Sequence, residues 1–265
     1  MDNMSRTLSK AESGDGTLIA YEQRGDGPPV VLVSGALCTS AAEAPLAGLL
    51  ASRFSVFTYD RRGRGASGDT APYAVEREIE DLAAVIGEAG GAASVHGTSS
   101  GAALALRAAA AGLPITQLSV YEPPYDPDEA PGAPPPPYEH RMRALLAEDR
   151  RGEALAVFLG EMGMPPEALD AMRGTPMWTD MEAVAPTLVY DHEVMAGGGV
   201  PTAMLSGIGT RVMVVDGGMS PPFMREAARL AAQALPRGRH RTLTGQTHEV
   251  APHVLAPLLL EFLSA

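Results

Sequence analysis

The residues best suited to chemistry in this 265-residue chain form the pentapeptide Gly97-Thr98-Ser99-Ser100-Gly101. The pattern G-x-S-x-G between a strand and a helix is typical of a nucleophile elbow, a sharp turn that exposes a serine hydroxyl. Side chains two residues to either side of the serine would collide in this turn, which favours Gly97 and Gly101. Ser99 would stand at a helix N-terminus, where developing negative charge is stabilised. The alternative is a plain serine-glycine turn.

A serine hydroxyl is a weak nucleophile and needs a base within hydrogen-bond reach. His248 is the best candidate, because its loop follows the last predicted strand and so lies at the carboxyl edge of the sheet. The other histidines are expected to be structural: His96 packed in a strand, His140 and His192 on solvated helix faces unless one reaches the pocket, His240 on the surface and His253 at a helix end.

The elements that must position these residues alternate regularly. Short apolar runs predict strands at 17–23, 30–33, 54–59, 93–96, 115–121, 211–215 and 240–243. Helical patterns fall at 41–53, 73–89, 99–111, 222–234 and 252–263. Strands separated by helices of this length predict an α/β fold with a mostly parallel sheet flanked by helices.

One long segment interrupts this alternation. Residues 123–137 hold eight prolines and predict an extended linker, followed by helical segments at 138–160, 165–173 and 177–195. We therefore expect a core of 1–123 and 207–265, with a helical cap of 124–206 inserted. Eight of the thirteen methionines and the only tryptophan, Trp178, fall in the insertion, which favours either a plastic apolar pocket or an ordinary helix core.

Composition excludes several classes of function. Lys plus Arg number 20 against 32 Asp plus Glu, and the net charge of −12 disfavours nucleic acid as a partner. Lys10 is the only lysine and Cys38 the only cysteine, which argues against a Schiff-base lysine and excludes an intrachain disulfide. Neither H-E-x-x-H nor a strand followed by G-x-G-x-x-G is present, so we expect no metal and no cofactor.

The N-terminal 16 residues are polar and lack the apolar region of a secretory signal. Nowhere does an apolar run approach the roughly 20 residues of a membrane span. We therefore expect a cytoplasmic protein that acts on a small molecule, away from membranes. The sequence leaves the oligomeric state open, a homo-oligomer included.

Taken in order, these motifs resemble the α/β-hydrolase superfamily. Segment 30–36 is similar to the strand and loop of its oxyanion hole, 59–65 to its strand-end turn and 245–248 to its histidine loop, while the insertion falls where the family carries a cap. The resemblance implies an α/β-hydrolase fold and a cofactor-free serine hydrolase that cleaves an ester or lactone of a moderately apolar molecule through an acyl-enzyme. Two alternatives are a lyase, cyclase or acyl transferase on the same scaffold and a ligand-binding protein with a hydrolase shell.

An oxyanion hole needs two backbone N–H groups aimed at the developing charge. Ser100 is expected to supply one and Ala36 the other, with Gly35 as a fallback. Residues expected to line the substrate pocket are Gly35, Leu37, Trp178 and Met219. The charged run Asp60-Arg61-Arg62 favours a structural turn anchored by ion pairs over a contact with substrate.

The acid that orients the histidine departs from the family's common pattern. Ser220 occupies the place where most members carry aspartate, and Asp216 lies four residues earlier. Glu122 follows the strand after the elbow helix, a position used by a minority that includes haloalkane dehalogenases and zearalenone-lactone hydrolases; the latter also resemble this chain around Ser99. We expect Ser99, His248 and Glu122 to form the triad, with Asp216 as the alternative acid.

Overall fold

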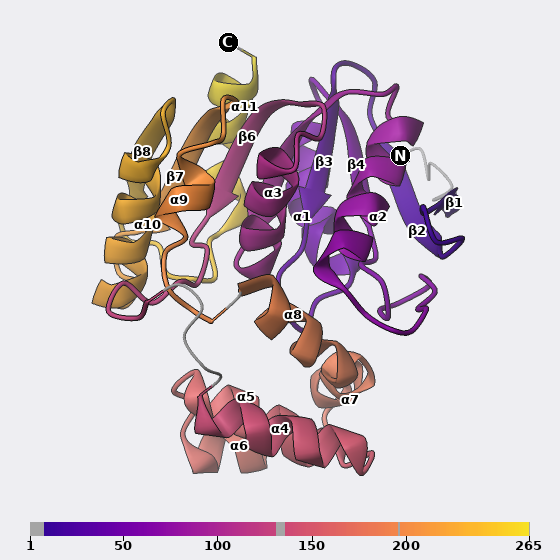
Figure 1. Cartoon of the computed structure of the whole chain (residues 1–265), viewed down its shortest axis with the longest axis vertical. Coiled ribbons are helices and arrows are strands. Elements are labelled where there is room, and N and C mark those ends of the chain that lie inside the picture. Colours follow the sequence, from indigo (N-terminus) through magenta and orange to yellow (C-terminus); the bar gives the residue numbers. More distant parts are fainter. Residues whose placement is uncertain (1–7, 131–135, 196, 265) are drawn as a thin grey trace.

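A computed structural model describes residues 8–130, 136–195 and 197–264, and its centre is a single eight-stranded sheet (Figure 1). The strands lie in the order β1-β2-β4-β3-β5-β6-β7-β8, and all pairs from β4 to β8 are parallel. They span β1 Ser9–Glu12, β2 Leu18–Arg24, β3 Pro29–Val33, β4 Ser55–Tyr59, β5 Ala93–Thr98, β6 Ile115–Tyr121, β7 Arg211–Gly217 and β8 Gly238–Leu243. The predicted α/β fold is confirmed.

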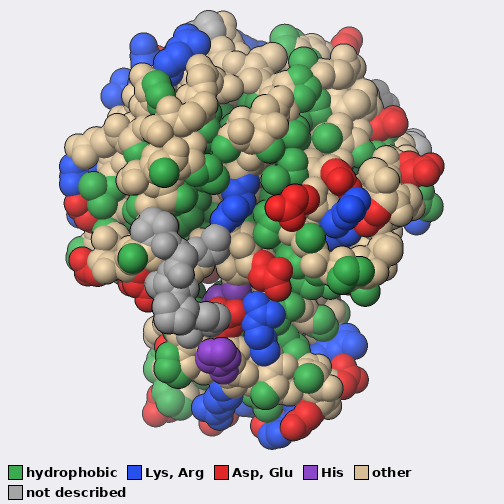
Figure 2. Space-filling view, viewed as in Figure 1, with side chains coloured by type: hydrophobic (Ala, Val, Ile, Leu, Met, Phe, Trp, Pro, Cys, Tyr) green, Lys and Arg blue, Asp and Glu red, His purple; other side chains and the backbone are tan. Residues whose placement is uncertain are grey.

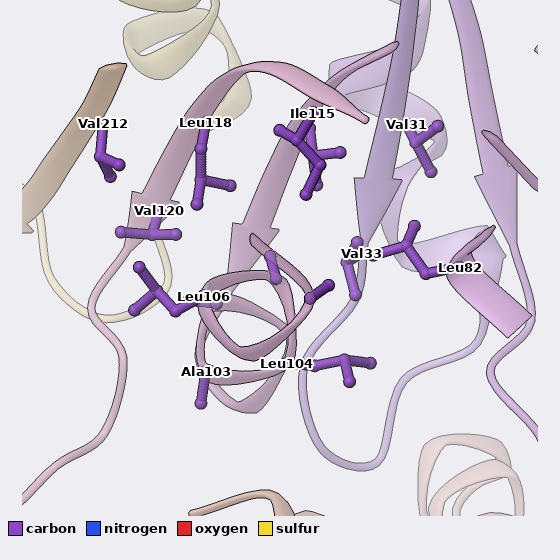
Figure 3. Close-up of a cluster of buried hydrophobic side chains, with 14 of the residues drawn as sticks. Val31, Val33, Leu82, Ala103, Leu104, Leu106, Ile115, Leu118, Val120 and Val212 are labelled. Atoms are coloured by element: carbon purple, nitrogen blue, oxygen red, sulfur yellow. The ribbon is translucent and has the colours of Figure 1, made fainter. Parts of the chain in front are cut away.

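Helices cover both faces of this sheet, as the apolar runs of the parallel strands require. One face is packed by α2 (Val75–Glu88), α3 (Ser100–Ala110) and α10 (Pro222–Ala234). The other is packed by α1 (Ala44–Leu50), which follows the short helix η1 (Ser40–Glu43), and by α11 (Pro252–Leu263). Figure 3 shows Leu104 and Leu106 of α3 beside the apolar side chains of the strands behind them.

Among the described strands, the edge strand β1 is the one that the sequence did not predict. Its four residues pair antiparallel with β2, and Ala11 alone among them is buried. A short edge strand with one inward side chain has almost no apolar pattern, so it cannot be told from the polar residues around it in the sequence.

The regular elements described within residues 124–206 are helices, and most of them form a lobe beyond the carboxyl ends of the parallel strands (Figure 1). Figure 2 shows charged side chains of both signs where this lobe meets the core. Its helices are α4 Pro137–Ala147, α5 Arg151–Glu161, α6 Pro166–Met172, α7 Pro176–Val184, η2 Ala185–Thr187, α8 Leu188–Met195 and α9 Thr202–Leu205. The α8 helix packs on α3 of the core, and α9 packs on α3 and α10.

Two continuous helices predicted in the insertion are wrong. The first breaks between α4 and α5, where Asp149 takes a left-handed conformation with φ 57°. The second breaks at η2, where Pro186 lacks the N–H that a continuing helix needs. Part of the proline-rich linker, residues 131–135, lies outside the described residues. At the ends of the insertion, the Asp126 N–H donates to the Gly198 oxygen at 2.8 Å.

Candidate active site

The site begins at the turn between β5 and α3. Ser99 has φ 55° and ψ −126°, a strained conformation for a residue with a side chain. A Cβ on Gly97 would lie 2.4 Å from the Gly101 oxygen, and one on Gly101 would lie 2.3 Å from the Val33 oxygen. Both positions therefore require glycine, as the elbow pattern predicts.

The loop after β3 lies against this serine. A Cβ on Gly35 would come within 3.0 Å of the Ser99 Cβ and 3.6 Å of its Oγ. Leu37, two residues on, is left-handed with φ 58°. Within the described part of the chain, neither the Ala36 N–H nor the Ser100 N–H has a hydrogen-bond acceptor. Two free backbone donors are therefore available next to Ser99.

A histidine–carboxylate pair follows the neighbouring strand ends. His248 Nδ1 lies 2.7 Å from Glu122 Oε2, and the Gly217 N–H donates to Glu122 Oε1 at 2.7 Å. Glu122 is fully buried, whereas a third of the His248 side chain is exposed. Burial alone would raise the pKa of Glu122, but His248, the Ser220 hydroxyl and the Gly217 N–H hold that pKa below its usual range. An ionised carboxylate at this distance favours the His248 tautomer that carries its proton on Nδ1 and leaves Nε2 unprotonated.

The loop that carries His248 is anchored by backbone contacts. The Tyr121 hydroxyl at the end of β6 donates to the Thr247 oxygen at 2.5 Å. The Met219 N–H, beyond the end of β7, donates to the Gln246 oxygen at 2.8 Å. The Gln246 side chain in turn accepts from the Ala251 N–H. These contacts hold the imidazole in place beside Glu122.

The alternative acid lies elsewhere. Asp216 Oδ1 is 3.2 Å from His240 Nε2 of β8, and Asp216 Oδ2 is 3.6 Å from Arg225 Nε of α10. The structure thus brings Glu122, and not Asp216, to His248. The prediction that His240 is a simple surface residue is wrong, because its side chain is about two-thirds buried against Asp216.

The remaining histidines differ in their surroundings. His96 is buried in β5, as predicted, and burial lowers its pKa to about 4. His140 and His253 are exposed. His192 departs from the predicted solvated helix face, since its side chain is mostly buried and its Nδ1 lies 3.3 Å from a Glu139 oxygen.

The arginine-rich turn after β4 is structural, as predicted. Arg61 and Arg62 are completely buried and form ion pairs with Glu78 and Asp81 of α2 at 2.6 and 2.7 Å. Asp60 does not share in these pairs. Its carboxylate accepts the N–H groups of Ser40 and Ala66 at 2.7 and 2.8 Å.

One buried carboxylate near the site is absent from the sequence predictions. Asp191 of α8 contacts Arg61, Arg64 and the Ser100 hydroxyl, at 2.7 to 2.9 Å. Its arginine partners lie 127 and 130 residues earlier in the chain. No local pattern in α8 marks it, so only the folded arrangement finds it.

The residues expected to line the pocket differ in their burial and surroundings. Trp178 is 5% exposed within the apolar cluster of the helical lobe, and Ala36 and Leu37 pack against that cluster. Met219 is exposed beyond β7. Contact of these residues with substrate stays a prediction. Residues 8–130, 136–195 and 197–264 contain no cluster of His, Cys, Asp or Glu that could hold a metal ion, and no helix in these ranges is long and apolar enough to cross a membrane.

Comparison with known proteins agrees with this architecture. An alpha/beta hydrolase from Sphaerobacter thermophilus is 56% identical, with a TM-score of 0.89 over 96% of this chain and 100% of that one. Two further structures share the fold. An esterase from Thermogutta terrifontis is 21% identical, with a TM-score of 0.75 over 97% of this chain and 98% of that one. An enol-lactonase from Burkholderia xenovorans is 20% identical, with a TM-score of 0.71 over 97% of this chain and 100% of that one. No curated protein matches significantly. The model of the alpha/beta hydrolase family matches residues 30–259, and the chain therefore belongs to that family.

Proposed function

We propose that this enzyme is a serine hydrolase that cleaves a carboxylic ester or lactone of a moderately apolar small molecule. The observation that carries the proposal is the 2.7 Å contact between His248 Nδ1 and buried Glu122. The elbow serine, Ser99, has φ 55°, and its N–H donates at 2.9 Å to the oxygen of the residue before Glu122. A histidine held in one tautomer is what a serine needs to become a nucleophile. The apolar cap cluster that touches Ala36 and Leu37 supports an apolar acyl or alcohol group.

In the proposed reaction, Ser99 Oγ attacks the acyl carbon and its proton passes to His248 Nε2. The carbonyl oxygen becomes an oxyanion that accepts the N–H groups of Ala36 and Ser100. The intermediate then collapses, the bond from the acyl carbon to the alcohol oxygen breaks, and His248 returns the proton to that oxygen. Water, deprotonated by the same histidine, then hydrolyses the acyl-enzyme and releases the acid.

Glu122 stays ionised throughout this cycle. The groups that hold its pKa low favour the carboxylate, which stabilises the imidazolium formed in each half-reaction. An esterase and an enol-lactonase are among the structures that share the fold, and both activities are compatible with this substrate class. At 20–21% identity they inform the fold, so the substrate class is argued from the site.

Covalent labelling tests the proposal. A fluorophosphonate should label Ser99 in the native enzyme and leave Ser99→Ala unlabelled, and that variant should lose about 10³-fold or more in kcat on p-nitrophenyl butyrate. Ser52→Ala is the matched control, because Ser52 is exposed and, among the described residues, its hydroxyl donates to the Leu49 oxygen alone. Retained turnover in Ser99→Ala would contradict the mechanism. Parallel assays on a δ-lactone separate lactonase from esterase activity.

A further inference from the structure

We propose that Asp191 of the cap is a positioning residue for the oxyanion hole, where it fixes both backbone donors through Arg64 and Ser100. This inference rests on the proposed function, because it assigns the role of oxyanion donors to the N–H groups of Ala36 and Ser100. It adds a link between the cap helix α8 and the reacting centre that neither the elbow motif nor the triad contains.

The first half of the link passes through Arg64. Arg64 Nη1 donates to the Gly35 oxygen at 2.6 Å, and Arg64 Nη2 donates to Asp191 Oδ1 and Oδ2 at 2.8 and 2.9 Å. The Gly35 oxygen and the Ala36 N–H belong to one planar trans peptide, so they point in opposite directions. By holding the oxygen, the guanidinium directs the Ala36 N–H away from itself. Gly35 lies against Ser99, which places this peptide beside the nucleophile.

The second half of the link is direct. The Ser100 hydroxyl donates to Asp191 Oδ1 at 2.7 Å and accepts from Arg61 Nη1 at 3.1 Å. Ser100 is the first residue of α3, and its own N–H has no acceptor within the described ranges. Two hydrogen bonds to its buried side chain fix this first turn, and with it the direction of the second donor.

Asp191 can perform this role because it is held firmly itself. It is 5% exposed, and Arg61 Nη1 also donates to it at 2.8 Å. Burial alone would raise the pKa of Asp191, but Arg64, Arg61 and the Ser100 hydroxyl keep that pKa below its usual range. The neighbouring Tyr190 stacks on Tyr73 of the core with ring centroids 3.8 Å apart, so α8 is also fixed against the core at the residue before the carboxylate.

A positioning role and a purely electrostatic role predict opposite changes in kcat for the substitution Asp191→Asn. Arg61 and Arg64 carry two positive charges, which Glu78 and Asp191 balance. Asp191→Asn would leave one uncompensated positive charge near the oxyanion. If charge alone mattered, that change would speed the reaction, because a positive charge stabilises an oxyanion. If Asp191 acts by orienting the two donors, the same change slows the reaction, since an amide oxygen cannot hold both arginines as a carboxylate does.

The test measures kcat and KM of Asp191→Asn on p-nitrophenyl butyrate. We expect kcat to fall about 10- to 100-fold, less than the roughly 10²–10³-fold loss on removing one oxyanion donor, with little change in KM. Affinity for an alkyl trifluoromethyl ketone, whose serine adduct carries an oxyanion, should weaken in parallel. Affinity for the matching methyl ketone should not change, because it resembles the ground state.

The matched control is Asp81→Asn. Asp81 forms the equivalent buried pair with Arg62, at 2.7 Å to both Nε and Nη2. Among the described residues, the other hydrogen-bond partners of Arg62 are Asp15 and the Arg77 oxygen, so no hydrogen bond joins it to the oxyanion loop. This variant should unfold at a lower temperature and keep its kcat. Ser100→Ala, which removes one hydroxyl and no charge, provides a second test should Asp191→Asn fold poorly; it should lower kcat a few-fold at unchanged KM.

Three results overturn the inference: a raised kcat in Asp191→Asn, an unchanged kcat in both Asp191→Asn and Ser100→Ala, or equal losses in Asp191→Asn and Asp81→Asn. These outcomes are distinct from failure of the proposed function, which shows as turnover in Ser99→Ala. An inactive Ser99→Ala together with a fully active Asp191→Asn would reject the positioning role alone.

Discussion

Two buried carboxylates stand at the ends of neighbouring strands, and each faces its own histidine. Glu122 follows β6 and lies 2.7 Å from His248, whereas Asp216 lies near the end of β7, 3.2 Å from His240. Both are almost completely buried, with 0% and 1% of their surface exposed. Burial and closeness to a histidine therefore do not distinguish the proposed catalytic acid from the other carboxylate.

What distinguishes the two pairs is the direction each takes from the sheet. His240 belongs to β8, and the second partner of Asp216 is Arg225 on α10, which covers one face of the sheet. Glu122 has φ 43°, a left-handed turn that carries its side chain to the loop beyond β8. That loop lies at the carboxyl edge, where the serine also stands. Both carboxylates stand at that edge, so what favours Glu122 as the proposed acid is that its partner is a histidine beyond the strands and not one within the sheet.

The largest effect expected from this comparison comes from Glu122→Gln. The amide cannot stabilise an imidazolium and permits the wrong tautomer of His248, so kcat should fall about 10⁴-fold, as for the equivalent change in serine proteases. Steady-state assays on p-nitrophenyl butyrate measure the loss. A larger loss in Asp216→Asn than in Glu122→Gln would transfer the role of acid to Asp216.

A smaller effect, of opposite sign, should come from moving the acid to the neighbouring strand end. Ser220 occupies the family's common aspartate position and is buried close enough to Glu122 to influence its pKa. In a Glu122→Gln background, Ser220→Asp should recover about 10- to 100-fold in kcat, because either strand end can present a carboxylate to Nδ1. The matched control places Asp at Ser119, which is buried in β6, and should recover nothing.

Removing the other carboxylate should affect stability more than rate. Asp216→Asn takes the charge from a pair whose partners are partly exposed, so the free energy of unfolding should fall by about 1 kcal/mol, and kcat should stay within about twofold. Urea unfolding at pH 7 and initial-rate assays on the same samples check both. A tenfold loss of kcat without loss of stability would show that the two pairs are coupled.

The sequence predicts the elements of the core well because their patterns are local. The 115–121 strand and the helices at 222–234 and 252–263 are found with their observed bounds, and the elbow follows from two glycines and a serine. Glu122 can be proposed from its place after a strand, although its left-handed turn has no sequence signal. Asp191 cannot be found in this way, because its partners come from the turn after β4 and from α3, far along the chain.

The breaks between the helices of the insertion also show where local sequence patterns fail to predict the structure. Pro186 is a local signal that marks η2 once the helix is considered residue by residue. Asp149 carries no such signal, and its left-handed turn lets α4 and α5 fold back to build the apolar cluster around Trp178. Tertiary packing decides that break, and a helical pattern alone predicts continuity.

The smallest expected effect concerns the Ser220 hydroxyl beside Glu122, the proposed acid. Ser220 Oγ forms no hydrogen bond of standard geometry within the described ranges, yet it lowers the pKa of Glu122. Ser220→Ala should therefore cost about 0.5 kcal/mol of unfolding free energy while Glu122 is ionised. Because a depressed carboxyl pKa stabilises the fold above the unfolded value of 4.5, the cost should be complete above that pH and vanish as the pH falls through the lower folded pKa. Urea unfolding from pH 7 down to the acid limit measures this trend.

Ser119→Ala, the control, removes a buried hydroxyl of β6 and should change stability by an amount independent of pH in this window. A cost in Ser220→Ala that stays constant with pH would show that the hydroxyl acts through packing and has no part in holding the charge on Glu122.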